Sequence, residues 1–147
     1  MQILFTTSNT LLSRAIRRQS GEPVSHCAIE FGGWVIHSNL RGVNVEPLAV
    51  FASHSQIVYS VEIPFDLDRF MGTLSQCWGT GYDFGALLYL GARTVLPFLP
   101  KRNLWQCNGM FLCVEFITEI LYGREESTMT PYQLYERLVA AQQTETV

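Results

Sequence analysis

The sequence predicts a single α+β domain over residues 1–147, with an antiparallel sheet first along the chain and helices after it. Two patterns lead to this prediction. Apolar residues alternate with a period of two through much of the first half, as in half-buried strands, and recur at helical spacing in the second half. The composition, 48% hydrophobic and only 16% charged, is that of an ordered protein long enough to enclose a core.

The chain opens with a predicted strand and helix. Residues 2–7 (QILFTT) form a short apolar run of strand type. Ser8 or Asn9 is expected to cap a helix that extends to about Gln19. The inner face of this helix is predicted to carry Leu11, Leu12, Ala15 and Ile16.

A β-hairpin is predicted next. The runs VSHCAIEF (24–31) and WVIHS (34–38) are both rich in β-forming residues, and Gly32-Gly33 between them suits a tight turn. Further strands are expected at GVNVEP (42–47) and IVYSVEI (57–63). Together these runs predict the antiparallel sheet.

Helices dominate the second half. Residues 66–78 place apolar side chains on one helical face, and a further helix is expected from Tyr82 to about Pro97. The segment MFLCVEFITEILY (110–122) is predicted to be a helix that stops at Gly123. The face of the 66–78 helix consists of Leu67, Phe70, Met71, Leu74 and Cys77.

The last helix has a clear start signal. Thr130 can act as its N-cap, Pro131 suits the first helical position and Gln133 the third, which is a capping-box arrangement. The helix is expected to reach about Ala141, and the tail QQTETV after it is expected to fray.

Charge and hydropathy argue against several classes of function. The net charge of −3 gives no basic surface for a nucleic-acid backbone. Arg14, Arg17 and Arg18 have helical spacing and are interpreted as a solvated face. The longest apolar run (84–100) is interrupted by Arg93 and is too short to span a bilayer. We therefore expect no nucleic-acid partner and no membrane span.

The cysteines are expected to be reduced. The N-terminal segment lacks a basic region followed by a long apolar run, so no signal peptide is evident. The spacing of Cys107 and Cys113 provides no CxxC pair, which argues against a structural zinc site. No cofactor is expected.

Cys113, His26 and His37 are the candidate catalytic residues. A thiol becomes a nucleophile where a helix N-terminus or an imidazole stabilises its thiolate and a base takes its proton. Cys113 lies in the early turns of a predicted helix, and the two histidines lie on the strands of the predicted hairpin. His26 is expected to be the base and His37 to orient its ring. Strand alternation points Cys27 away from His26, which makes Cys27 a poor alternative nucleophile.

Each of these residues also has a structural interpretation. A cysteine on an apolar helix face is most often buried packing, and a strand histidine is most often structural. His54 is expected on the surface, in the loop 52–55, whereas Glu115 and Glu119 are interpreted as a solvated helix edge, with Glu115 close enough to contact Cys113. A metal site formed by the three candidate residues is a further alternative.

Several motifs together resemble a known superfamily. SHCAIEFGGWVIHS (25–38) is similar to the SHVGIY…IHA pattern of the NlpC/P60 superfamily, and LCVEFI (112–117) to the CSEFV-type segment around its nucleophile. The cysteine helix here follows the histidine strands, which resembles the circularly permuted branch with YiiX-like bacterial hydrolases and the lecithin retinol acyltransferase group. That branch usually has Val and Gly where this chain has Cys27 and Ala28. Other similar segments are LLSRAIRR (11–18), GYDFGALL (81–88) and STMTPYQLYERL (127–138).

The resemblance implies a permuted papain-like fold, in which the nucleophile helix packs against the sheet. It implies a cysteine hydrolase with Cys113 as nucleophile, His26 as base and His37 as orienting residue, and it assigns Tyr82 and Asp83 to substrate binding. The expected reaction is cleavage of an amide or peptide bond, with bacterial cell-wall peptidoglycan as one option. The alternatives are an acyl (lipid or thioester) hydrolase or transferase and a non-catalytic interaction module.

The same resemblance suggests where the protein works. A hydrolase of this size, without a wall-binding module, is compatible with a role in a larger phage or bacterial assembly. The expected location is cytoplasmic or virion-associated, and the expected partner is a peptide or acyl substrate.

Overall fold

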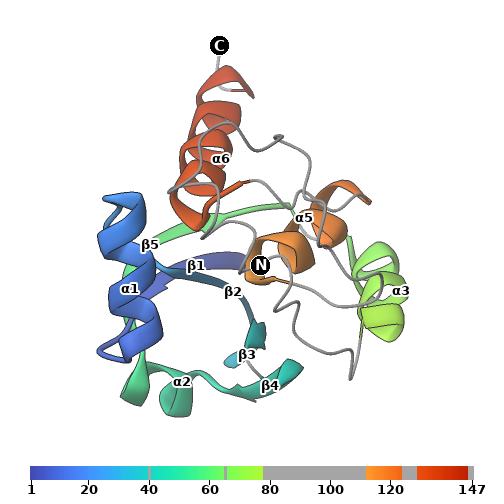
Figure 1. Ribbon diagram of the computed structural model, residues 1–147. Coiled ribbons are helices and arrows are strands. Elements are labelled where there is room, and N and C mark those ends of the chain that lie inside the picture. Colours follow the sequence, from blue (N-terminus) through green and yellow to red (C-terminus); the bar gives the residue numbers. More distant parts are fainter. Residues whose placement is uncertain (40, 65, 78–111, 124–128, 146–147) are drawn as a thin grey trace.

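A five-stranded antiparallel sheet organises the fold (Figure 1). The computed structural model describes residues 1–39, 41–64, 66–77, 112–123 and 129–145. The elements in these ranges are β1 (Gln2–Thr7), α1 (Leu11–Ser20), β2 (His26–Phe31), β3 (Trp34–Asn39), β4 (Gly42–Pro47), α2 (Leu48–His54), β5 (Gln56–Glu62), α3 (Leu67–Cys77), α5 (Cys113–Tyr122) and α6 (Pro131–Glu145). The α+β class is therefore confirmed.

The strands lie in the order β4-β3-β2-β1-β5, so the first strand of the chain lies inside the sheet. Each expected strand is present, with β5 pairing to β1 at the edge opposite β4. The β2–β3 hairpin turns at Gly32 and Gly33, whose φ angles are 60° and 84°. Two consecutive positive φ angles are what a two-residue hairpin turn needs, and glycine adopts them without steric cost.

Helices cover both faces of the sheet (Figure 1). On one face α5 packs over β2 and β3, and α6 over β1 and β5. On the other face Phe51 of α2 packs against Leu4, Ala28 and Val35. The larger core lies under α5 and α6 and includes Ile3, Phe5, Cys27, Ile29, Phe116 and Ile117. Burial of a large apolar side chain in such a core contributes about 1.5–3 kcal/mol.

The first helix starts later than the sequence suggests. Its N-cap is Thr10, whose hydroxyl accepts the Ser13 backbone N–H at 3.2 Å, rather than Ser8 or Asn9. The prediction of the cap was wrong by one or two residues because three consecutive residues between β1 and α1, Ser8, Asn9 and Thr10, are all suitable N-caps.

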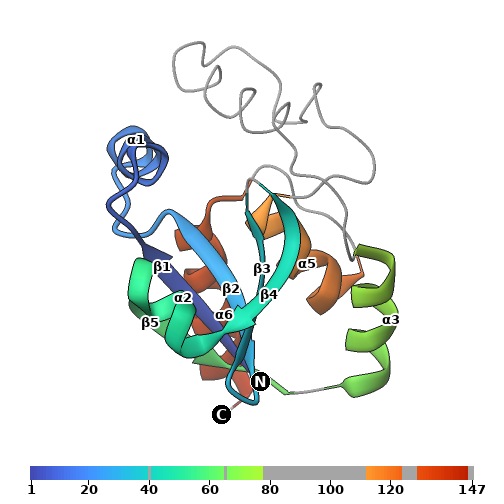
Figure 2. The same cartoon turned by 90° about the horizontal axis from the view of Figure 1, so that it is seen from below.

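The predicted inner face of α1 is wrong for two of its four residues, Leu11 and Ala15. Leu11 is 82% exposed and Ala15 is exposed, whereas Leu12 and Ile16 are half-buried. Ser13 is the buried residue of this helix. Figure 2 shows the reason: α1 lies apart from the helices that cover the sheet. The helical spacing of the apolar residues correctly predicted the helix, but the residues chosen as its inner face do not pack on the sheet.

The remaining helices mostly follow the prediction. α5 begins at Cys113 rather than residue 110 and ends at Gly123, whose φ is 65°. The capping box of α6 is present, with Thr130 and Gln133 exchanging two hydrogen bonds of 3.1 Å, and the helix continues to Glu145. The segment 52–55, expected as a loop, instead contains the C-terminal turn of α2.

On α3, Phe70 and Cys77 are buried as expected, whereas Leu67 and Met71 are exposed. The helix expected from Tyr82 lies outside the described residues. None of the helices in the described ranges is long and apolar enough to cross a membrane.

Candidate functional site

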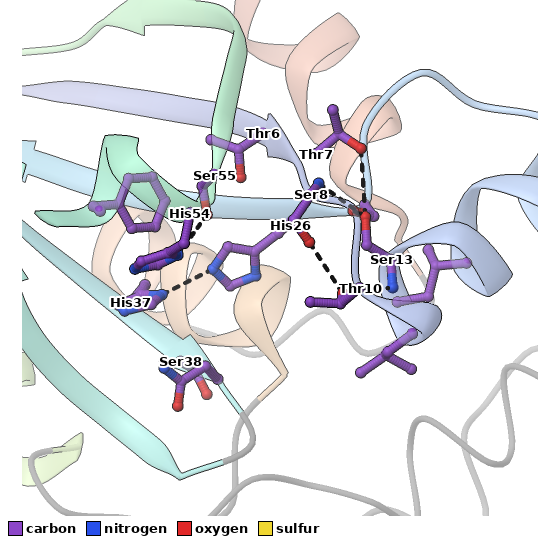
Figure 3. Close-up of a pocket in the computed structure, with 15 residues that line it drawn as sticks. Thr6, Thr7, Ser8, Thr10, Ser13, His26, His37, Ser38, His54 and Ser55 are labelled. Carbon is purple, nitrogen blue, oxygen red and sulfur yellow. Dashed lines mark hydrogen bonds between the residues drawn. The ribbon is translucent and has the colours of Figure 1, made fainter.

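His26 and His37 form a hydrogen-bonded pair of imidazoles (Figure 3). Nε2 of His26 lies 3.0 Å from Nδ1 of His37, and the two ring planes are inclined by 74°. The hairpin register explains the proximity, because Ile29 pairs with Ile36, and its continuation puts His37 opposite Ala28, diagonal to His26. Both rings lie on the α2 face, where Phe51 packs edge-on against His37 with the ring centroids 5.2 Å apart.

Cys113 is the first residue of α5, and its thiol contacts the side chains of His26 and Cys27. The hydrogen bond from Cys27 and then the charge and hydrogen bond of His26 hold the pKa of Cys113 well below its usual range, against the opposing effect of burial. Cys113 is 7% exposed. The structure thus brings the three candidate catalytic residues into one chain of contacts: Cys113, His26, His37.

The two partners of Cys113 come from opposite faces of β2. Cys27 belongs to the core beneath α5, whereas His26 faces α2, as strand alternation predicts. Cys113 reaches both because His26 is the first residue of β2, at the end of the strand. Cys27 is fully buried, and burial followed by the contact with Cys113 raises the pKa of its thiol. Cys27 is therefore a neighbour of the candidate nucleophile, a role that the sequence did not indicate.

Glu115 differs from its sequence-based interpretation. It is fully buried rather than part of a solvated helix edge, and its Oε2 accepts the Leu112 backbone N–H at 2.7 Å. Glu119, one turn later, is half-buried. The carboxylate of Glu115 reaches back over the first turn of α5, where backbone N–H groups lack partners within the helix. It therefore caps the helix turn that presents Cys113.

A carboxylate lies behind the imidazole pair. Oε1 of Glu46, on β4, lies 3.1 Å from Nε2 of His37, and Oε2 lies 3.1 Å from Nε2 of His54. Burial, and next the charge of His26, lower the pKa of His37 to about 4, although Glu46 acts in the opposite direction. His54 lies near the surface as expected, but its bond to Glu46 was not expected. Glu46 carries no distinguishing sequence signal beyond its place on a strand.

The imidazole pair opens onto a cleft of about 250 Å³ between α1, α2 and the ends of β1 and β3 (Figure 3). His26, His37, Phe51 and His54 form one side of it. Much of the remaining lining carries hydroxyl groups, from Thr6, Thr7, Ser8, Thr10, Ser13, Ser25, Ser38 and Ser55. A substrate in this cleft would meet many short hydrogen-bonding groups beside the candidate base.

Two other expectations concern binding residues. Tyr82 and Asp83, assigned to substrate binding by resemblance, lie outside the described residues. The metal-site alternative required Cys113, His26 and His37 to surround one ion. No three His, Cys, Asp or Glu side chains are grouped in that way within the ranges that the structure describes.

Comparisons with known proteins give no match, either among protein-family models or among curated proteins. The geometry of the site and the motifs in the sequence are therefore the basis for inferring a function.

Proposed function

We propose that the protein is a cysteine hydrolase with a permuted papain-like fold, which cleaves an amide or peptide bond. Cys113 is the nucleophile, His26 the general base and His37 the residue that orients His26. One observation carries the proposal: Cys113 at the first position of a helix contacts His26, which in turn lies 3.0 Å from a second imidazole. A nucleophile, a base and an orienting group in sequence are the parts that covalent acyl transfer needs.

The position of Cys113 favours its thiolate. The N-terminal end of a helix carries partial positive charge, which stabilises a negative sulfur at its first residue. The hydrogen bond from Cys27 and the charge of His26 act in the same direction. Proton transfer from Cys113 to His26 therefore gives an imidazolium beside a thiolate, the reactive pair of a cysteine hydrolase.

The reaction then proceeds through a thioester. The Cys113 sulfur attacks the substrate carbonyl carbon, and the tetrahedral intermediate collapses as His26 gives its proton to the departing amine. A water molecule transfers one proton to His26 and attacks the thioester. The carboxylic acid product leaves, and the sulfur departs as thiolate beside the imidazolium of His26. No external oxidant or cofactor enters these steps.

Backbone N–H groups supply the oxyanion site in this proposal. Glu115 already occupies the N–H of Leu112, the N-cap. The next N–H groups along the helix, of Cys113 and Val114, have no acceptor within the helix by geometry. They are the donors that we assign to the oxygen of the tetrahedral intermediate.

The cleft beside the base His26 favours a polar substrate, although Cys113 itself is not among the residues that line it. Its hydroxyl-rich lining suits the amide groups of a peptide or the hydroxyl groups of an amino sugar better than it suits an acyl chain. Bacterial peptidoglycan combines peptide and amino-sugar parts, and so is the first substrate to test. The acyl alternative depended on apolar residues 84–90, which lie outside the described residues.

The experiment compares the wild type with Cys113→Ala and with Cys77→Ala, which removes a different buried cysteine, the last residue of α3. Each protein is incubated with purified peptidoglycan and, separately, with acyl thioesters and phospholipid vesicles. Products are identified by mass. The expected result is cleavage of peptide bonds by the wild type and Cys77→Ala, and none by Cys113→Ala.

Other outcomes are equally informative. Release of fatty acid alone would show that the substrate is an acyl thioester or lipid rather than an amide, with Cys113 still as the nucleophile. A Cys113→Ala protein as active as the wild type would overturn the proposal. Absence of any product, together with a Cys113 that iodoacetamide does not alkylate at pH 7, would favour a non-catalytic interaction module.

A further inference from the structure

The carboxylate of Glu46 lies between two imidazoles. Its two oxygens lie 3.1 Å from Nε2 of His37 and 3.1 Å from Nε2 of His54. The side chain of His37 is 4% exposed, that of Glu46 20% and that of His54 51%. The contact with His37 is thus the buried one, and the contact with His54 faces solvent.

The proton positions follow from what each group can donate. Nε2 of His37 lies 3.1 Å from Oε1 of Glu46 without the geometry of a hydrogen bond, but a negative oxygen at this distance favours an N–H over a lone pair, so we place the ring proton of His37 on Nε2. The neutral ring then has a bare Nδ1, which accepts from Nε2–H of His26 across 3.0 Å. Nδ1 of His26 is consequently left bare for the proton of the thiol. Glu46 therefore selects, through His37, the tautomer of His26 that can act as a base.

The same placement of protons on His37 also suits the imidazolium form of His26. Once His26 holds a second proton, both of its nitrogens donate, and Nδ1 of His37 must accept. The opposite tautomer of His37 would place two N–H groups against each other. Because burial and then the charge of His26 lower the pKa of His37 to about 4, the ring has a single proton at neutral pH and its placement matters.

We propose that Glu46 is a positioning residue of this site, which fixes the tautomer of His37 and thereby prepares His26 to take the proton of Cys113. The inference rests on the proposed function, since it concerns the base of that reaction. Within the described residues, the polar groups that act on His37 are His26 from β2, Asn44 and Glu46 from β4, and His54 from α2, and of these Asn44 makes a hydrogen bond that raises the pKa of His37. Among them Glu46 alone is a carboxylate.

The test compares Glu46→Gln with the wild type. The glutamine has nearly the same shape but can present an N–H to Nε2 of His37, which favours the opposite tautomer. Glu62→Gln is the matched control, because Glu62 is also a strand glutamate but lies on β5, at the other edge of the sheet. A second variant, Glu46→Ala, removes the acceptor without offering a donor.

Two readouts separate this inference from the proposed function. Imidazole ¹⁵N NMR at pH 7 reports which nitrogen of His37 carries the proton, whether or not a substrate is known. We expect Nε2–H in the wild type and Glu62→Gln, and a larger share of Nδ1–H in Glu46→Gln. We also expect alkylation of Cys113 by iodoacetamide at pH 7 to slow about tenfold in Glu46→Gln, equivalent to a loss of thiolate by that factor.

The outcomes are distinct. An unchanged His37 tautomer in both Glu46 variants, with wild-type alkylation rates, would overturn the role of Glu46 and leave the nucleophile in place. A wild-type Cys113 that does not react at pH 7 would instead count against the proposed function. A changed tautomer with slower alkylation supports both.

Discussion

Cys27 and Cys113 are in direct contact, one from β2 and the other from the first turn of α5. The thiol of Cys27 donates to Cys113, and this hydrogen bond is the largest of the influences that lower the pKa of Cys113. The contact therefore affects the reactivity of the proposed nucleophile.

Replacing Cys27 is expected to make Cys113 less acidic. In Cys27→Ala the thiolate loses its hydrogen-bond donor, so the pKa of Cys113 rises toward its usual value and alkylation by iodoacetamide requires a higher pH. Cys27→Val should do the same while better filling the core, where the alanine costs about 1 kcal/mol. The measurement is the alkylation rate of Cys113 against pH, with Cys77→Ala as control. A midpoint equal to that of the wild type would contradict the assigned role.

His37 makes the stability of the fold depend on pH. Its pKa is about 4 in the folded protein, against an ordinary value of 6.5 for the unfolded chain. The unfolded chain binds more protons between these values, so the contribution of His37 is complete above pH 6.5 and is lost as the pH falls toward 4. The free energy of unfolding of the wild type should therefore fall by about 3 kcal/mol more than that of His37→Gln between pH 7 and pH 4.

Urea denaturation of both proteins at a series of pH values measures this difference. The difference between the two curves isolates the contribution of His37. Parallel curves would mean that His37 is not buried in its neutral form.

The hairpin could be predicted because the information is local: two β-rich runs flank a Gly-Gly turn. The contact between His26 and His37 could not, because the sequence leaves open whether both rings point to the same side; the observed register places them on one face. The start of α6 was equally local, since Thr130 and Gln133 cap each other within one turn. The role of Cys113 in a site was supported by motif order rather than by any local rule.

The residues that surround the two histidines and Cys113 are placed by contacts between segments that lie far apart in the sequence. The α2 helix has seven residues, too few to reveal a helical period, so the hydrogen bonds of Glu46 to His54 and its close contact with His37 were not foreseen. Leu11 has helical spacing but no neighbouring sheet face to cover. Glu115 was taken for a solvated residue because charge usually indicates exposure, yet its carboxylate serves a buried helix end.

Glu115 is expected to stabilise the start of α5. Glu115→Ala removes the acceptor of the Leu112 N–H inside the protein and should lower the free energy of unfolding by about 2 kcal/mol. Glu115→Gln keeps an oxygen at the same place and should lose less. Glu119→Ala, on the same helix and half-buried, should change stability by at most about 0.5 kcal/mol. Urea denaturation at pH 7 checks the order, and equal losses for Glu115→Ala and Glu119→Ala would show that the cap contributes little.

Two glycines are expected to respond in opposite directions to alanine. Gly33 has a φ of 84° and open space around an added Cβ, so Gly33→Ala meets only backbone strain and should lose about 1–2 kcal/mol. Gly72 lies within α3, also in open space but without positive φ, so Gly72→Ala should gain about 0.5–1 kcal/mol through helix propensity. Urea denaturation measures both changes. Because neither glycine contacts Cys113, its alkylation rate in the folded protein should stay at the wild-type value. A stabilising Gly33→Ala would show that the hairpin turn tolerates another backbone geometry. The turn would then not be the feature that fixes the strand register placing His26 beside His37.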